Sequence, residues 1–127
     1  MSRKKARECV MKQVFAMDIS GELTSENVKI LQEENMVKGQ EEYIKNILKM
    51  MIENLDKIDA MIKKYSTWDF DRMSKVDIAI LRVAITEILY TNIPDSVSAS
   101  EAVELAKVYG TENSYRYING ILSSLIK

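Results

Sequence analysis

The chain has 127 residues, of which 46% are hydrophobic and 29% charged, with a formal net charge of −1. This composition is typical of one folded globular domain. It contains one cysteine and no histidine, which excludes a disulfide framework and the commonest general base and metal ligand. Carboxylates and Cys9 form no recognisable catalytic or ligand spacing, so we expect no enzyme, no cofactor and no metal site.

The small net charge hides an uneven distribution. Residues 1–17 carry five basic side chains against Glu8 alone, whereas residues 18–59 carry ten acids against five bases. A basic end and an acidic middle are compatible with one anionic partner and one basic partner. No apolar run is as long as a membrane span, and residues 2–7 are too basic for a signal peptide, so we predict a cytoplasmic protein.

Helical periodicity dominates from the first residues to the last. Four glycines and one proline fall mostly between periodic segments, which favours an all-α domain of six or seven helices over a β fold. A short helical turn within residues 66–74 would be the seventh. The expected helices cover residues 2–18, capped by Ser2, then 25–39, 40–65, 75–90 and 98–110, with a last helix that begins at Thr111 or Asn113.

The helix over residues 75–90 is apolar on all sides, which predicts a place in the middle of a bundle. Ser74 with Asp77, and Ser98 with Glu101, resemble capping boxes that would begin two helices. Gly110 is expected as the C′ glycine that ends the second of them.

Two further expectations follow from the loop before Ser74 and from Arg82. The loop would divide the single domain, residues 1–127, into packed subbundles of about 1–66 and 74–127. Arg82 is a charge inside an apolar helix, so it should pair with Glu87 or Glu101.

The first helix begins with cations where the helix dipole favours acids. Arg3, Lys4, Lys5 and Arg7 each oppose the dipole by a few tenths of a kcal/mol, roughly. Sequence features that break a local rule without local gain are expected at functional sites. We interpret these cations as phosphate contacts for RNA or DNA; a solvated basic tip is the alternative.

The last helix begins in the same unusual way, in the stretch "GTENSYRYINGIL". Its first turn carries Tyr115, Arg116 and Tyr117, beside backbone N–H groups that lack helical partners and can bind an anion. Arg116 could bind phosphate, and either tyrosine could stack on an unpaired base. Alternatively, one tyrosine is buried and Arg116 is solvated. Together with the basic first helix, the pattern indicates a surface for single-stranded RNA.

The chain resembles the NusB family of bacterial transcription antitermination factors over nearly its whole length. Three stretches carry the resemblance: "MSRKKARECVMKQVFAMD", "VDIAILRVAITEILY" and "IPDSVSASEAVELAKVYGTENSYRYINGIL". The resemblance implies an all-helical fold of two subbundles. It also implies binding of boxA RNA together with ribosomal protein S10 (NusE), within a complex of Nus factors on RNA polymerase that suppresses premature termination.

By position, the resemblance also implies site residues. The RNA-contacting set would comprise Arg3, Lys4, Lys5, Arg7, Tyr65, Asn113, Arg116 and Tyr117. Asp77 matches a position near the surface for the protein partner. Asn113 departs from the acid common in the family, and loss of that negative charge should favour RNA. A helical adaptor that binds only protein is the competing function; steep salt dependence of RNA binding would exclude it.

Overall fold

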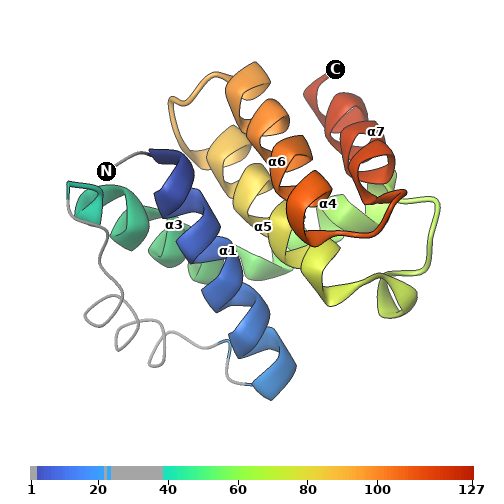
Figure 1. Cartoon of the computed structure of the whole chain (residues 1–127), viewed down its shortest axis with the longest axis horizontal. Coiled ribbons are helices and arrows are strands. Elements are labelled where there is room, and N and C mark those ends of the chain that lie inside the picture. Colours follow the sequence, from blue (N-terminus) through green and yellow to red (C-terminus); the bar gives the residue numbers. More distant parts are fainter. Residues whose placement is uncertain (1–2, 22, 24–38) are drawn as a thin grey trace.

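A computed structural model describes residues 3–21, 23 and 39–127 of the chain. In this part of the chain there are helices and no strands, so the predicted all-α fold is confirmed. The expected cap at Ser2 and the helix over residues 25–39 lie outside the described residues. The elements, labelled as in Figure 1, are α1 (Arg3–Ser20), α3 (Glu41–Glu53), α4 (Leu55–Tyr65), the 3-10 turn η1 (Phe70–Arg72), α5 (Lys75–Tyr90), α6 (Asp95–Tyr109) and α7 (Ser114–Ile126).

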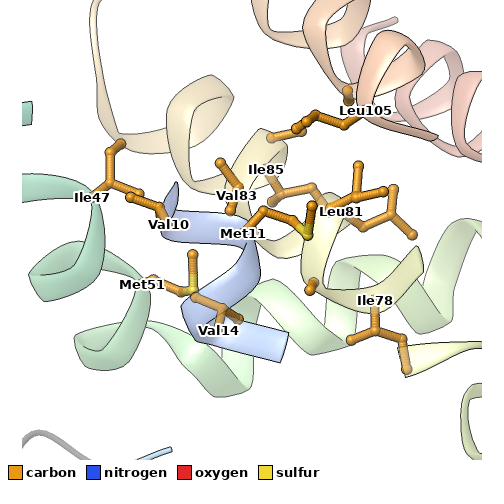
Figure 2. Close-up of a cluster of buried hydrophobic side chains, with 14 of the residues drawn as sticks. Val10, Met11, Val14, Ile47, Met51, Ile78, Leu81, Val83, Ile85 and Leu105 are labelled. Atoms are coloured by element: carbon orange, nitrogen blue, oxygen red, sulfur yellow. The ribbon is translucent and has the colours of Figure 1, made fainter. Parts of the chain in front are cut away.

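Helix α5 is the centre of the molecule, as its apolar composition predicts. Every residue from Asp77 to Glu87 is buried, and α5 packs against α1, α3, α4, α6 and α7. Figure 2 shows one apolar cluster built from several of these helices, including Val10, Met51, Ile85 and Leu105. The division into two subbundles stays a prediction, because α5 is shared by helices from both proposed halves.

The helix expected over residues 40–65 is interrupted at Asn54. The amide Nδ2 of Asn54 donates a hydrogen bond to the carbonyl oxygen of Met50 at 2.8 Å, and its backbone adopts φ −123° and ψ 20°. Asparagine side chains compete with the helical backbone in this way. The apolar spacing continues across the break, since Ile58 and Ile62 remain buried. Periodicity therefore could not reveal two helices.

The two predicted capping boxes have different outcomes. Ser74 caps α5 as predicted, because the Asp77 N–H donates to its Oγ at 3.4 Å. The prediction for Ser98 is wrong: α6 begins at Asp95, directly after Pro94. Proline has a fixed φ and no N–H, so it suits a helix start. The Ser98 N–H donates to the Pro94 carbonyl at 3.2 Å, which places Ser98 inside the helix.

Gly110 ends α6 as predicted, but a glycine is needed there because of close packing and not because of a left-handed conformation. It occupies the C-cap position with φ −88° and ψ −173°, not a left-handed C′ position. A Cβ at Gly110 would lie 2.5 Å from Cβ of Ser114 and 2.7 Å from the carbonyl oxygen of Ala106. Glycine thus lets the start of α7 approach the end of α6 closely. Asn113 is the N-cap residue of α7, but its side chain makes no capping hydrogen bond.

Candidate nucleic-acid interface

The start of α1 presents a basic tip, formed by Arg3, Lys4 and Lys5. All three side chains are exposed, and the first turn of the helix contains no acid. The Arg3 Nε donates to Oε1 of Gln40 at 2.6 Å, and its guanidinium lies 4.4 Å from the ring centroid of Tyr43. These contacts hold Arg3 against the start of α3. The basic tip is therefore an outward-facing group of cations of the kind that binds phosphates.

Arg7 lies elsewhere, because it is 5% exposed and faces the core. Its Nε donates to Oε2 of Glu87 at 2.7 Å, and the carboxylate of Glu101 is 3.8 Å from its Nη1. Glu87 also accepts hydrogen bonds from the hydroxyls of Tyr43 and Ser98. Burial opposes the charge of Arg7, but Glu87 raises the pKa of Arg7 above its usual value. Arg7 thus has a structural role inside the fold, whereas the side chains of the basic tip are exposed.

A cavity of about 400 Å³ lies where the start of α5, the start of α7 and the segment before α5 meet. It brings together three predicted site residues that are distant in the sequence: Asp77, Asn113 and Tyr117. We call it the α5–α7 pocket. Its lining residues are Trp68, Arg72, Met73, Ser74, Asp77, Thr111, Asn113, Ser114 and Tyr117.

Two aromatic rings form one wall of the α5–α7 pocket. Tyr117 is half-buried, and its hydroxyl shares a hydrogen bond with the hydroxyl of Ser66. Trp68 is 64% exposed, and its ring meets that of Tyr117 edge to face, with centroids 6.2 Å apart and planes at 76°. Sequence reasoning missed Trp68 and predicted for its segment only a helix break with a short helical turn. The chain's one tryptophan, set among polar residues, was the available indication.

Asp77 supplies a buried carboxylate at the pocket. It is 8% exposed, and the Ser114 hydroxyl donates to its Oδ2 at 3.1 Å. Among the described residues, Oδ1 has no hydrogen-bond partner. Desolvation raises the pKa of Asp77, and the hydrogen bond from Ser114 offsets this only in part. Oδ1 is covered from solvent, and a buried acceptor without a partner costs stability.

Arg116 and Tyr65 lie outside the lining of the pocket. Arg116 is exposed, and its Nε donates to the Tyr115 hydroxyl at 3.0 Å. The Tyr115 ring also lies 5.6 Å from Nζ of Lys107. Tyr65, at the end of α4, is half-buried with Nζ of Lys64 at 5.2 Å from its ring. The predicted site residues therefore form a tip on α1 and a group around the start of α7, and Figure 1 shows α6 between them.

The side chains gathered here suit single-stranded RNA chemically. Cations at the tip can bind phosphates, exposed rings can stack on bases, and a carboxylate can accept from a base N–H. Within residues 3–21, 23 and 39–127 no three His, Cys, Asp or Glu side chains cluster as metal ligands would. No helix in the same ranges is long and apolar enough to cross a membrane.

Comparisons with known proteins identify the family. The profile of the NusB family matches residues 4–127. The transcription antitermination protein NusB of Alkaliphilus oremlandii is 44% identical over 130 residues, covering 100% of this chain and 94% of its own. The solved structure of T. maritima NusB superposes with a TM-score of 0.86 at 35% identity, covering 98% of this chain and 90% of its own. A structure of the antitermination factors NusB and NusE in complex with dsRNA gives a TM-score of 0.82 at 27% identity, covering 97% and 94%. The chain therefore belongs to the NusB family.

Proposed function

We propose that this chain is a transcription antitermination factor that binds boxA-type single-stranded RNA together with ribosomal protein S10 (NusE). It would act in the cytoplasm, with other Nus factors on RNA polymerase. Curated relatives at about 40% identity carry the name transcription antitermination protein NusB. A structural neighbour was solved with NusE and dsRNA, which supports both partners for this chain.

The α5–α7 pocket is the observation that carries the proposal. Its lining combines the exposed Trp68 ring, the half-buried Tyr117 ring and the carboxylate residue Asp77. An unpaired base could stack on the rings and donate from its Watson–Crick edge to the carboxylate. Stacking on an aromatic side chain contributes about 1–3 kcal/mol per base.

The basic tip would contribute the part of the affinity that depends on salt. Arg3, Lys4 and Lys5 are exposed, and Figure 1 shows α6 between the start of α1, which carries them, and the start of α7. Removal of one cation that binds a phosphate of a single strand should reduce the salt slope by about 0.7. Asp77 was assigned to the protein partner from sequence, and its place in the pocket lets it serve RNA or S10.

Trp68 offers a direct test, because it is the only tryptophan of the chain and lies against Tyr117. A boxA-type oligonucleotide should quench its fluorescence, with an affinity that falls steeply with salt and rises when S10 is added. Tyr117→Ala should weaken RNA binding by about 1–3 kcal/mol. Tyr90→Ala, a half-buried ring at the other end of α5, is the matched control.

The outcome depends on measuring stability and affinity on the same samples. If folded Tyr117→Ala binds RNA as well as the wild type, Tyr117 is a packing residue and the pocket is not the RNA site. If the wild type binds S10 but no RNA at low salt, the chain is a protein-only adaptor. Either result would contradict the proposal.

A further inference from the structure

A cation and a ring meet at a point between the basic tip and the α5–α7 pocket. The ammonium of Lys12, on α1, lies 5.2 Å from the ring centroid of Tyr109, the last residue of α6. The Lys12 side chain is 56% exposed, and Tyr109 is half-buried. Neither residue belongs to the tip or to the pocket. The pair therefore has no assigned role, and it combines a cation, as in the tip, with an aromatic ring, as in the pocket.

The helices place this pair on a line with the two RNA surfaces. Arg7 reaches Glu101 and Lys12 reaches Tyr109, so α1 and α6 run side by side in the same direction. Lys4 lies two helical turns before Lys12, a distance of about 12 Å at 1.5 Å per residue. Lys4, Glu8 and Lys12 are spaced at i, i+4 and i+8 and so lie along one side of α1.

The line continues from Tyr109 into the pocket. Gly110 follows Tyr109 directly, and Thr111 and Asn113 line the pocket. The five residues from Tyr109 to Asn113 are four steps of the backbone, which span at most about 14 Å. With the 5.2 Å between Lys12 and Tyr109 included, the path from Lys4 to Asn113 is at most about 31 Å, so a stacked strand with about 3.4 Å per nucleotide would need roughly nine nucleotides. Such a strand would pass Lys12 and Tyr109 on the way.

The groove beside the pair contains acids, but each has a cation close by. Carboxylate oxygens of Glu8, Glu101 and Glu104 lie 3.7 Å, 3.8 Å and 3.7 Å from nitrogens of Lys12, Arg7 and Lys107, respectively. The groove is therefore not a net acidic surface that would repel phosphates strongly. Val108, 69% exposed, also borders it and would suit a protein segment. The cation held over a half-buried ring favours RNA instead, because it continues the pattern of the tip and the pocket.

We propose that Lys12 and Tyr109 form a bridging RNA contact, in which the Lys12 ammonium binds a phosphate and the Tyr109 ring supports the adjacent nucleoside. The inference rests on the proposed function and extends it. Glu8 and Tyr109 already hold the Lys12 side chain, so less side-chain entropy is lost on binding. A long strand would contact the tip, the Lys12–Tyr109 pair and the pocket as one continuous site. A short strand would contact only one of them.

An RNA-length experiment tests the bridge. Trp68 fluorescence would give the affinity and salt slope for a single-stranded 12-mer and for a trimer that reaches only the pocket. Lys12→Gln should weaken binding of the 12-mer severalfold and lower its salt slope by about 0.7, with trimer binding unchanged. Tyr109→Leu should weaken binding of the 12-mer at least fivefold. Lys49→Gln, an exposed lysine on α3, is the matched control and should change neither.

Glu8→Gln should change the affinity for the 12-mer in the opposite direction. It removes the carboxylate that competes with phosphate for Lys12, so the 12-mer should bind more tightly. If Tyr109→Leu does not fold, Lys12→Gln and Glu8→Gln carry the test, because both positions are on the surface of α1.

Three results are distinguishable from one another. If the wild type binds neither RNA, the proposed function itself fails. If the wild type binds the 12-mer but Lys12→Gln leaves its affinity and salt slope unchanged, the bridge is refuted and the proposed function stands. If Lys12→Gln weakens S10 binding and not RNA binding, the groove is a protein surface, which also overturns the bridge.

Discussion

Replacement of Arg7 by methionine separates a structural role from an RNA contact. Arg7 and Glu87 form an ion pair whose side chains are 6% and 1% exposed, so water cannot replace the missing partner. Removal of one member of a buried pair costs about 3–5 kcal/mol. The hydroxyls of Tyr43 and Ser98 still donate to Glu87, which places the expected loss near the lower end of that range.

The loss should be visible in both thermal and denaturant unfolding. For a chain of this size, about 3 kcal/mol corresponds to a fall in melting temperature of roughly 10–15 °C. The urea midpoint should fall with an unchanged m-value, because the same surface is exposed on unfolding. Measured at low temperature on folded protein, the affinity for an RNA trimer that reaches only the pocket should stay close to that of the wild type. Lys4→Met, at the basic tip, should do the reverse and flatten the salt dependence without loss of stability.

A second substitution tests whether the loss of stability comes from the unpaired charge of Glu87. Glu87→Gln combined with Arg7→Met removes both charges and keeps one amide oxygen, which can accept from the hydroxyl of Tyr43 or Ser98, while the other hydroxyl can accept from the amide NH2. The double variant should therefore recover a large part of the lost stability. If Arg7→Met keeps its urea midpoint but loses RNA affinity and salt slope, Arg7 is an RNA contact and its structural role is refuted.

Three other substitutions test the remaining charges. Arg82→Met should cost about 3 kcal/mol of unfolding free energy, because it leaves two carboxylates without their buried cation, but it should not change RNA affinity; an unchanged urea midpoint would contradict this. Asp77→Asn should raise the melting temperature at pH 7 and weaken RNA or S10 binding. Burial raises the pKa of Asp77 in the folded state, so the ionised form of Asp77 lowers the free energy of unfolding at pH values above that pKa. The stability gained by Asp77→Asn should therefore shrink as the pH falls through the pKa of Asp77. A gain that does not change with pH would refute the raised pKa. Asn113→Asp should weaken RNA binding yet stabilise α7 by roughly 0.3–1 kcal/mol through the helix dipole; tighter binding would show that no phosphate lies nearby.

The sequence was sufficient to predict the arrangement around α5. An apolar surface on all sides of a helix has one stable location, the interior, so the central position follows from composition. The break at Asn54 and the start of α6 depend instead on local hydrogen bonds at Asn54 and on Pro94. The partners of Arg82 were also predicted wrongly. They are Asp59 on α4 and Asp18 on α1, whereas the predicted Glu87 and Glu101 pair with Arg7.

The candidate site was predictable only in its parts. Tyr117 could be selected from the first turn of α7, and the family resemblance added Asn113 and Asp77. Their meeting in one cavity depends on how closely α7 approaches α5, which the spacing of residues does not show. Trp68 joins the pocket from a segment without periodicity, so no pattern could place it.

Arg7 shows why charge alone is a weak guide on α1. It carries the same charge as Lys4 and lies three and seven residues before the buried Val10 and Val14. Those spacings put Arg7 on the apolar face of the helix, where a cation must find a carboxylate. Helical position, applied to each cation separately, would have predicted an ion pair for Arg7 and solvent for Lys4.

The buried ion pairs also set the register between α1 and α5. Arg7 binds Glu87 near the end of α5, and Asp18 lies 3.2 Å from Arg82, so α1 is held antiparallel to α5 at both ends. Buried ionic groups are best attested as devices that select one register. We therefore expect the double variant Arg7→Met with Glu87→Gln to bind a trimer in the pocket normally but a 12-mer more weakly, because the tip would no longer be fixed relative to the pocket. Equal affinity losses for both RNAs, or none, would show that packing of Val10 and Val14 alone sets the register.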